Sequence, residues 1–337
     1  MKAYEIQGTF GLASLRRVER PDPRPGPGQV VVEIKASSLN YRDWLTVQGL
    51  YNPKQRLPLI PLSDGAGRVV ERGPGAERFV LGARVVANFS PGWVCGEGTR
   101  SKFRTSLGGP NDGTLCERMV LPEDGLLEIP EHLSFEEAAT LPCAALTAFN
   151  ALVAQGGLLP GDVVLILGTG GVALFGLQFA KLAGARVIIT SSSDDKLARA
   201  RALGADEGIN YQSVPEWAKQ VRELTGKRGA DHVLEVGGVG TFNESVRAVR
   251  FGGTVSVIGQ LTGGAGEVNL VPVLMQNIRV QGVTVGSREL FERMNRAVSN
   301  HRLKPVIDRV FPFEEAPRAF EHLAKGAHFG KVCIHHG

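Results

Sequence analysis

Cysteine and histidine are sparse in this 337-residue chain, and neither forms a recognisable metal motif. The four cysteines, at positions 95, 116, 143 and 333, include no Cys-x-x-Cys pair, and their spacings match no structural zinc pattern. The seven histidines include no HxxxH or HExxH motif. We therefore expect free thiols, a reducing compartment and a cytoplasmic location rather than a disulfide framework or a structural metal.

Long apolar runs and blocks of one charge are absent as well. No segment approaches the roughly 18–20 consecutive apolar residues of a membrane span, and the first ten residues lack the apolar core of a secretory signal. The formal net charge is only +4, and no run of Lys and Arg is interleaved with aromatic residues. We therefore expect neither a membrane nor a nucleic acid as partner, and a small-molecule substrate remains.

Glycine is abundant, with 43 residues, and it divides the first part of the chain into short strands. Val-rich segments at 29–35, 65–71 and 82–87 are separated by Gly/Pro turns, a pattern typical of a small or partly open β-barrel. Residues 90–113 are rich in glycine and proline and show no strand pattern. Because loops longer than about 12–15 residues are usually functional or disordered, we expect this loop to shape a substrate pocket together with Leu50–Leu57.

From about residue 128, predicted strands and helices alternate. Ser134 and Glu137 form a capping box that starts one helix, and a second helix is expected over Thr147–Gln155. The alternation that follows predicts a doubly wound parallel sheet with helices on both faces. The expected elements are strands at 163–167, 186–190, 232–236, 254–258 and 278–285 and helices at 172–182 and 194–203.

The end of the chain is again predicted to be rich in β-strands, like its beginning. Strands are expected at 306–311 and 330–334, around a helix near 314–325. A discontinuous substrate domain is therefore predicted, with the tail folding back onto the first half of the chain. The predicted domains are a β-rich catalytic domain from residues 1–127 and 288–337 and an α/β Rossmann domain from residues 128–287.

The segment from Gly168 to Ala173 carries the strongest local signal. It follows an apolar strand, opens a helix and matches the dinucleotide fingerprint G-x-G-x-x-G/A through Gly168, Gly170 and Ala173. Gly168 permits the tight turn, Gly170 lets the backbone approach a pyrophosphate, and the helix N-terminus favours negative charge. The alternative is a strand–helix turn without a ligand.

The next predicted strand bears on the choice of cofactor. NAD enzymes usually place Asp or Glu at its end to bind the ribose 2′-hydroxyl, whereas this chain has Ser191, Ser192 and Ser193. Lys196 follows in the first turn of a helix, where it could pair with a 2′-phosphate. The opposing interpretation is that the serines only cap the helix, with Asp194 and Asp195 disfavouring a phosphate. We favour NADP(H), with NAD(H) as the alternative.

These motifs resemble the medium-chain dehydrogenase/reductase superfamily over nearly the whole chain. The resemblance is carried by the loop at 168–173 and by Gly330-Lys331-Val332. Within the superfamily, Ser38–Asp43, Gly49–Tyr51 and Leu141–Thr147 resemble the quinone oxidoreductase and enoyl reductase branches. The resemblance implies a GroES-like catalytic domain, a Rossmann domain, and a nicotinamide cofactor held between them.

The zinc-dependent alcohol dehydrogenases of this superfamily hold their metal with a Cys, the His of a Gly-His-Glu motif and a later Cys. The first of these places falls at Asn40, the second reads Leu62-Ser63-Asp64, and only Cys143 keeps a thiol. One soft ligand cannot build a site that needs three, so we predict a zinc-independent protein. Cys143 is then expected to be a small buried residue.

Without zinc, another group must manage the proton. Reduction of a conjugated C=C bond by hydride leaves an enolate, and a Tyr hydroxyl is a suitable acid. The resemblance to enoyl reductases points to Tyr51 as this acid and to Asn40 as a partner of the substrate carbonyl or the cofactor; simple packing of Tyr51 in its loop is the alternative. It also suggests Thr147 as a nicotinamide contact. The expected cofactor-binding residues are Thr147, Gly168, Gly170, Gly171, Val172, Ala173, Ser191, Ser192, Lys196, Tyr211, Gly237, Ile258 and Gly259.

The sequence therefore predicts an NADPH-dependent reductase of quinones or α,β-unsaturated carbonyl compounds. A zinc-free alcohol or carbonyl dehydrogenase and a non-enzymatic NADPH-binding protein are the alternatives. The β-rich segment at 278–285 is expected at an open edge of the Rossmann sheet, where it could pair with its copy in a second subunit. We therefore expect a homodimer.

Overall fold

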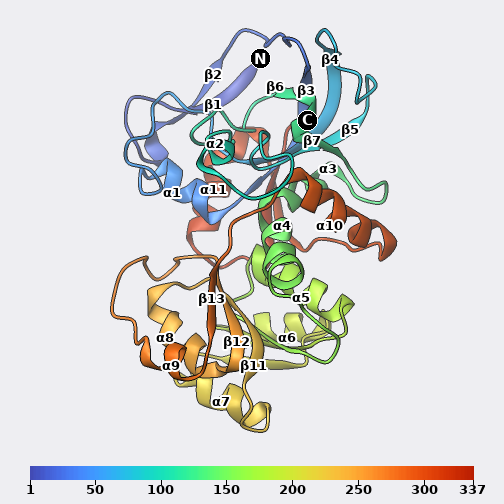
Figure 1. Cartoon of the computed structure of the whole chain (residues 1–337). Coiled ribbons are helices and arrows are strands. Elements are labelled where there is room, and N and C mark those ends of the chain that lie inside the picture. Colours follow the sequence, from blue (N-terminus) through green and yellow to red (C-terminus); the bar gives the residue numbers. More distant parts are fainter. The chain divides into compact units, whose positions relative to one another are not determined.

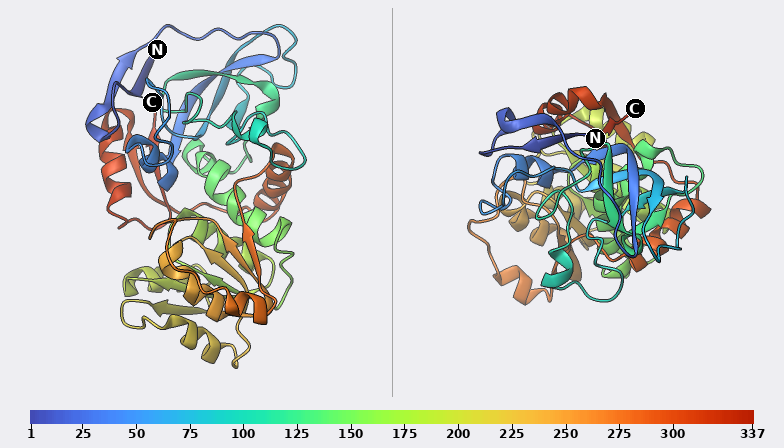
Figure 2. Two further views of the ribbon diagram at one scale, coloured as in Figure 1. Left: turned by 60° about the vertical axis from the view of Figure 1, so that its left-hand side comes forward. Right: turned by 90° about the horizontal axis from the view of Figure 1, so that it is seen from above.

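The computed structural model describes residues 1–337 and divides them into two units (Figure 1). Unit 1 consists of Met1–Leu146 and Val285–Gly337, and unit 2 of Thr147–Thr284. The boundary expected at 127/128 therefore lies at 146/147, and the one expected at 287/288 lies at 284/285. Figure 2 shows from two further sides that both chain termini belong to unit 1.

A seven-stranded sheet forms the frame of unit 1. Its strand order is β14–β15–β3–β4–β5–β7, with β6 also paired to β3, and only β14 and β15 run parallel. A separate antiparallel pair is formed by β1 and β2. The strands are β1 (Lys2–Ile6), β2 (Leu15–Glu19), β3 (Gln29–Leu39), β4 (Asp64–Arg72), β5 (Arg84–Ala87), β6 (Arg118–Pro122), β7 (Leu126–Glu128), β14 (Ile307–Pro312) and β15 (Lys331–His335).

Strand β3 positions the candidate site of unit 1. Its first half pairs with β6 and its second half with β15, so that Leu39 is the register partner of Val332. The β3–β4 pairing shifts register at two points, and such irregularities bend a strand. As a result, the end of β3 lies beside the start of β15, although the two are far apart in the sequence.

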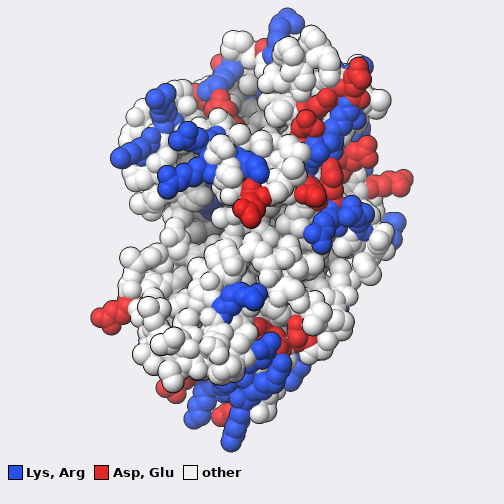
Figure 3. Space-filling model, viewed as in Figure 1, with Lys and Arg blue, Asp and Glu red and all other residues white.

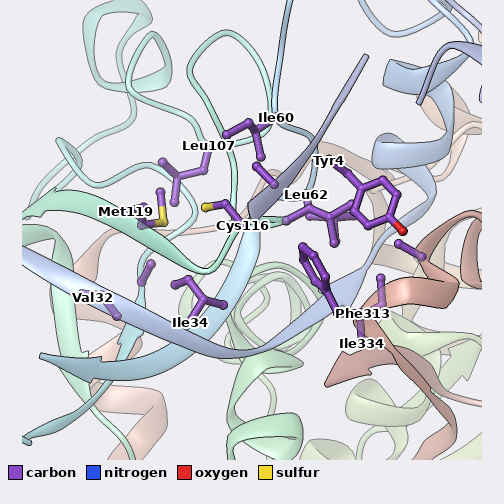
Figure 4. Packing of buried hydrophobic residues seen from close by; sticks show 14 of the residues in the cluster. Tyr4, Val32, Ile34, Ile60, Leu62, Leu107, Cys116, Met119, Phe313 and Ile334 are labelled. Atoms are coloured by element: carbon purple, nitrogen blue, oxygen red, sulfur yellow. The ribbon is translucent and has the colours of Figure 1, made fainter. Parts of the chain in front are cut away.

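The core of unit 1 lies between this sheet, the β1–β2 pair and the C-terminal helix. Figure 4 shows its residues, among them Tyr4 and Phe313, whose rings meet edge to face with centroids 5.2 Å apart. Cys116 and Met119 fill the other end of this cluster, and Cys116 is 1% exposed. All four cysteines are free thiols.

The helices explain why the first boundary differs from its prediction. The expected capping box is present, since Ser134 Oγ accepts from Glu137 N–H and the Glu137 carboxylate accepts from Ser134 N–H at 2.8 Å. The helix that it starts, α3 (Phe135–Ala139), packs against β3, β4 and β15. It therefore belongs to unit 1. The other helices of this unit are η1 (Leu12–Ser14), α1 (Tyr41–Val47), α2 (Arg100–Phe103), η2 (Glu123–Gly125), η3 (Leu141–Ala145), α10 (Arg288–Asn300), η5 (Phe313–Glu315) and α11 (Ala316–Ala324).

The helical segment that crosses the boundary between the two units contains two π-helices. The helix expected over Thr147–Gln155 is α4 (Leu146–Phe149), flanked by two wide-turned π-helices, η3 before it and η4 (Asn150–Ala154) after it. Turns of this kind are rare and frequently occur at functional sites. Cys143 and Thr147 both lie in this segment.

Unit 2 is a six-stranded parallel sheet with the order β10–β9–β8–β11–β12–β13. Counted from β8, this is the 3-2-1-4-5-6 order of a doubly wound Rossmann sheet, in which ligands bind at the carboxyl ends of the central strands. The predicted fold class is therefore confirmed. The elements are β8 (Val163–Ile166), α5 (Gly171–Leu182), β9 (Arg186–Ser191), α6 (Asp194–Ala202), β10 (Glu207–Asn210), α7 (Trp217–Leu224), β11 (Ala230–Glu235), α8 (Val239–Ala248), β12 (Val249–Val257), α9 (Val271–Met275) and β13 (Arg279–Gly282).

Two expected elements differ from what the structure shows. The strand expected over 278–285 is limited to β13, which pairs with β12 on one side only, because the chain leaves the sheet after Gly282. The loop expected over 90–113 contains the short helix α2. No helix is long and apolar enough to cross a membrane.

Surface charges of unit 1 are mixed in sign, as the side shown in Figure 3 illustrates. Several of them form local ion pairs that fasten α10 to the strands around it. Arg288 lies 2.8 Å from Asp124, and Arg78 lies 3.0 Å from Glu292.

Candidate active site

The loop between β8 and α5 has the backbone of a dinucleotide site. Gly168 has φ +76°, a conformation that favours glycine, and its N–H donates to Thr190 Oγ1 at 3.3 Å. A Cβ at Gly168 or at Gly170 would have no neighbouring atom within 4 Å, so both glycines border open space at the N-terminus of α5. Residues in this arrangement fit a pyrophosphate.

The same helix contains a glycine that sequence reasoning missed. A Cβ on Gly176 would lie 2.4 Å from Leu234 Cδ1, so this glycine allows α5 to approach β11 closely. Ala173, the last residue of the fingerprint, is also buried, at 2% exposed. A Gly one helical turn after the fingerprint is the sequence feature that could have predicted this close contact between helix and strand.

The carboxyl end of β9 brings Ser191 and Tyr211 together. Ser191 is buried, its Oγ accepts from Ser193 N–H at 3.3 Å, and its carbonyl accepts from Tyr211 N–H. Ser193 caps α6 by accepting from Lys196 N–H. Of the three serines, Ser193 is therefore the one that caps the helix. Ser192 is exposed. The Asp194 carboxylate accepts from Asn210 at 2.9 Å.

Gly237, Ile258 and Gly259 lie at the carboxyl ends of β11 and β12, and Glu235 organises them. The backbone N–H groups of Ile258 and Gly259 donate to the Glu235 carbonyl at 2.8 and 3.3 Å. The fully buried Glu235 carboxylate accepts from the backbone of Gly237 at 2.7 Å and of Gly238 at 3.0 Å. It also accepts from the hydroxyls of Thr241 and Ser245. The sequence analysis did not identify Glu235. An acid directly before Val236-Gly237-Gly238 is the feature that could have predicted a carboxylate bound to this backbone.

Parallel strands end on the same edge of a sheet, so these loops share one edge of unit 2. Apart from Thr147, the predicted cofactor residues lie at the carboxyl ends of five strands: β8, β9, β10 (Tyr211), β11 (Gly237) and β12. Thr147 lies apart from these loops in the chain, in α4, and is buried.

Asn40 of unit 1 ends β3 and caps helix α1. Its N–H donates to the Asp43 carboxylate at 2.8 Å, its side-chain N–H donates to Ser63 Oγ at 3.4 Å, and its Oδ1 accepts from Lys331 Nζ. The Asn40 side chain also hydrogen-bonds to the buried Asp64 carboxylate, which lowers the pKa of Asp64 against the larger effect of burial. Asn40 is therefore bound into a buried network, which sequence reasoning did not foresee.

The end of α1 sets the place of Tyr51. Gly49 has φ +72°, as is common just after a helix, and a Cβ there would lie 2.6 Å from the Phe10 ring. The next two N–H groups, of Leu50 and Tyr51, both donate to the Leu45 carbonyl. The turn leaves the Tyr51 side chain 50% exposed.

Arg42 links Tyr51 to the 90–113 loop. Its guanidinium lies 4.8 Å from the centre of the Tyr51 ring and 5.2 Å from that of Phe89. It donates to the carbonyls of residues 107, 108 and 109 at 2.9, 3.2 and 3.0 Å. A cation between two rings that also binds three carbonyls is fixed in position. No local motif marked Arg42 in advance.

A buried charged cluster surrounds Asn40. Asp64 is fully buried; its carboxylate accepts from Ser63 Oγ at 2.7 Å and from Cys143 N–H at 3.2 Å. Burial raises the pKa of Asp64 to about 6, although the positive charge of Lys331 opposes this. Burial also raises the pKa of Asp43, against the opposing charge of Arg42.

The three places that hold zinc in related enzymes meet here but do not fit the metal. Cys143 is the one thiol at these places; it is partly exposed rather than fully buried as expected, and desolvation raises the pKa of its thiol. The Asn40 oxygen is occupied by the Lys331 ammonium. No group of three or more His, Cys, Asp or Glu side chains is placed to hold a metal ion. The donor set that a catalytic zinc requires is therefore missing from these places.

Comparisons with known proteins place both units in one family. Residues 26–131 match the family model described as an alcohol dehydrogenase GroES-like domain, and residues 171–300 match that of a zinc-binding dehydrogenase. The zinc-type alcohol dehydrogenase-like protein C1773.06c of Schizosaccharomyces pombe is 42% identical over 331 residues, which cover 96% of each chain.

The descriptions of two similar solved structures name different nicotinamide cofactors. A structure described as an NAD-dependent alcohol dehydrogenase is 38% identical, with a TM-score of 0.91 over 100% of both chains. The 2-octenoyl-CoA carboxylase reductase CinF, in complex with NADP and 2-octenoyl-CoA, is 27% identical, with a TM-score of 0.88 over 99% of this chain and 87% of that one. The chain belongs to the medium-chain dehydrogenase/reductase superfamily and is an NAD(P)H-dependent oxidoreductase with a GroES-like unit and a Rossmann unit.

Proposed function

We propose that the protein is a zinc-independent, NADPH-dependent reductase of quinones or α,β-unsaturated carbonyl compounds. The observation that carries the proposal is the chemistry at the three zinc places, where an amide, a hydroxyl and a single thiol stand in place of three metal ligands. An alcohol is difficult to oxidise without a strong base or a Lewis acid at its oxygen. A conjugated carbonyl compound already has an electrophilic carbon and needs only a group to stabilise charge on oxygen and a source of one proton.

The preference for NADPH is supported by the end of β9. No carboxylate of this strand is placed to bind a ribose 2′-hydroxyl, and the nearest acid, Asp194, is hydrogen-bonded to Asn210. Exposed Ser192 and the half-exposed Tyr211 leave a polar surface there. Lys196, in the first turn of α6, adds positive charge for a 2′-phosphate.

In the proposed reaction, bound NADPH supplies a hydride to the conjugated carbon. Asn40 would orient the substrate carbonyl by exchanging one of its amide hydrogen bonds, to Ser63 or Asp64, for one to the substrate. Tyr51 would give its hydroxyl proton to the carbanion carbon of the resulting enolate. Arg42 holds the Tyr51 ring and the 107–109 segment in fixed positions, which reduces the entropy cost of this arrangement.

A carbonyl reductase or alcohol dehydrogenase is the second candidate, and the names of the relatives favour it. Both the Schizosaccharomyces pombe relative and the NAD-dependent structure are described as alcohol dehydrogenases or similar to them. This candidate requires the protein to polarise an unconjugated carbonyl.

An oxidation assay with purified protein separates these candidates. NADPH and NADH are each followed at 340 nm against quinones, enones, enoyl thioesters and saturated aldehydes. We expect turnover of conjugated acceptors with NADPH and little turnover of saturated aldehydes. Faster reduction of aldehydes than of every conjugated acceptor would select the second candidate, and binding of NADPH without turnover of any acceptor would leave a non-enzymatic role.

A further inference from the structure

A cleft of about 640 Å³ in unit 1 is lined by none of the residues assigned to the reaction. Its walls come mainly from the first residue of the chain, the segment that follows β2, the 90–113 loop and β6. Pockets that bind small molecules usually have volumes of about 300–1,000 Å³. The cleft is therefore large enough for a small organic ligand, and the proposed reaction gives it no role.

The deepest part of the cleft is apolar. Its lining residues Ile60, Leu107, Cys116 and Met119 are each at most 8% exposed and belong to the core cluster of unit 1, where Figure 4 shows their side chains close together. The Cys116 thiol donates to the Arg118 carbonyl at 3.2 Å, and burial raises its pKa to about 12, so it carries no charge at neutral pH. This surface, the apolar floor of the cleft, fits the hydrocarbon part of a ligand.

Prolines make much of the wall rigid. Four of them line the cleft: Pro21, Pro23, Pro91 and Pro122. A proline ring fixes φ, so the chain at these positions has little freedom to rearrange. Because the wall is already formed, a ligand would bind with a smaller loss of conformational entropy.

Most charged groups at the rim of the cleft are paired. Arg20 contacts Glu5 and, at 2.8 Å, Asp112. The Asp22 carboxylate lies 2.8 Å from Arg118 and 2.9 Å from the N-terminal ammonium group. These three cations and three carboxylates balance, so together they leave no net charge at the cleft.

Arg104 adds an unbalanced positive charge. It lines the cleft, is exposed and forms no ion pair. Its backbone is held on both sides, since its N–H donates to the Arg100 carbonyl at 3.0 Å and its carbonyl accepts from the Asn111 side chain at 2.8 Å. The fork of a guanidinium group matches a carboxylate. A singly charged carboxylate fits better than a phosphate, because Asp22 and Asp112 would repel the larger charge more strongly.

We propose that this cleft binds a small organic acid, whose hydrocarbon chain lies on the apolar floor and whose carboxylate pairs with Arg104. Two features favour this ligand over a neutral or doubly charged one: a preformed apolar surface, and a single cation without a partner beside it. The binding is reversible and forms no covalent bond. This inference is independent of the proposed function, so either can fail without the other.

The location is tested by NMR with protein labelled with ¹³C at its methionine methyl groups. Met1 and Met119 line the cleft, whereas Met275 lies in α9 of unit 2 and Met294 is buried in α10. The chain has only these four methionines, so each signal can be assigned by a single substitution to leucine. Octanoate, titrated into the full chain, should shift the signals of Met119 and Met1 until they saturate and leave the other two unchanged. A titration in which the Met119 signal does not move would overturn the proposal.

The role of the charge is tested by calorimetric titration of octanoate. Arg104→Met should weaken binding by about tenfold, which is within the usual worth of a hydrogen bond to a charged group. Arg100→Met is the matched control, since Arg100 is exposed in the same helix α2, has no ion pair and does not line the cleft. It should bind octanoate with the wild-type Kd, and the melting temperatures of both variants check their folding.

Octanamide has the same chain as octanoate but no charge. It should bind the wild-type protein more weakly than octanoate does, and Arg104→Met should bind the two compounds about equally. Equal affinity of Arg104→Met and Arg100→Met for octanoate would reject the pairing with Arg104. Binding of octanamide to the wild-type protein as tightly as octanoate would reject an organic acid as the ligand class.

Discussion

At the scale of single residues, the chemistry of unit 1 depends on contacts between residues far apart in the chain. Tyr51 and Asn40 could be chosen from the sequence because their local motifs resemble those of enoyl reductases. Lys331 and Arg42 could not, because the first acts through the β15–β3 pairing and the second through the carbonyls of residues 107–109. Local patterns contain no information on such pairings.

Tyr51→Phe tests the proposed acid. The substitution removes only the hydroxyl, and the ring can keep its contact with Arg42. Turnover of the best enone should fall by about 10²–10⁴ if protonation limits the rate, with the Kd for NADPH unchanged. Tryptophan fluorescence confirms folding, and Tyr41→Phe, at a second partly exposed Tyr, is the control. A folded Tyr51→Phe protein with the wild-type rate would remove Tyr51 from the mechanism.

Cofactor choice is tested at Ser192 rather than at Ser191. Ser191 is the last residue of β9, but it is buried and hydrogen-bonded, so a carboxylate there would disturb folding. Ser192→Asp places the charge at the exposed neighbour. Repulsion of a 2′-phosphate should weaken NADPH binding by roughly 1–3 kcal/mol and change NADH binding much less. Tighter binding of NADH than of NADPH by the wild-type protein would refute our interpretation of the serine cluster.

At the scale of elements, sequence periodicity predicts the Rossmann unit better than the β-rich unit. The strand–helix alternation and the Gly168–Ala173 loop are local signals, and both appear in the structure, although the last expected strand, 278–285, is shortened to β13. The boundary near residue 128 was misplaced because the capping box at Ser134 starts a helix that packs on the sheet of unit 1. A helix pattern alone does not reveal which sheet the helix covers.

Asp231, near the start of β11, has a carboxylate whose hydrogen bonds should determine how stable the fold is at acid pH. Burial alone would raise the pKa of Asp231, but hydrogen bonds from Arg228, Val163 N–H and Arg250 lower it from 3.8 to about 2. Because the folded-state pKa is below the unfolded value, the stabilisation is complete above about pH 4 and is lost as the pH falls toward 2. A shift of this size corresponds to about 2 kcal/mol.

Asp231→Asn should therefore lower the free energy of unfolding at neutral pH by about 2 kcal/mol or more, since two arginines lose their partner. Urea unfolding from pH 7 to pH 3 measures this, and the difference from wild type should shrink toward the acid end. Asp195→Asn, at an exposed position of α6, is the control. A difference that stays constant with pH would show that the carboxylate is not responsible.

At the scale of the whole molecule, we predict that the purified protein contains no stoichiometric zinc. The places of the catalytic ligands hold Asn40, Ser63 and Cys143, of which only Cys143 is a soft ligand, and only Cys95 lies within the 90–113 loop. Elemental analysis of protein purified without chelator should find far less than one zinc per chain. A value near one zinc per chain would contradict the zinc-independent function, and removal of that zinc with loss of activity would assign the metal to catalysis.

The final prediction concerns the open edge of unit 2. Strand β13 pairs only with β12, and an unpaired strand edge can bind a second copy of itself. Large apolar side chains are exposed close to it in the chain: Leu270, Val271, Leu274 and Met275 are each at least 65% exposed, and Val280 of β13 is 42% exposed. Exposed apolar groups of this density usually mark an interface.

We therefore expect a homodimer in which two copies of β13 pair to extend the sheet across a twofold axis. Light scattering at micromolar concentration should give twice the 36.1 kDa chain mass. Leu274→Glu should shift the protein toward monomer because it would bury a charge in the interface, whereas Val80→Glu, at an equally exposed apolar residue of unit 1, should not. Since each unit has its own core, the monomeric variant should still bind NADPH. A wild-type monomer, or a dimer that Leu274→Glu leaves intact, would show that this edge is not the interface.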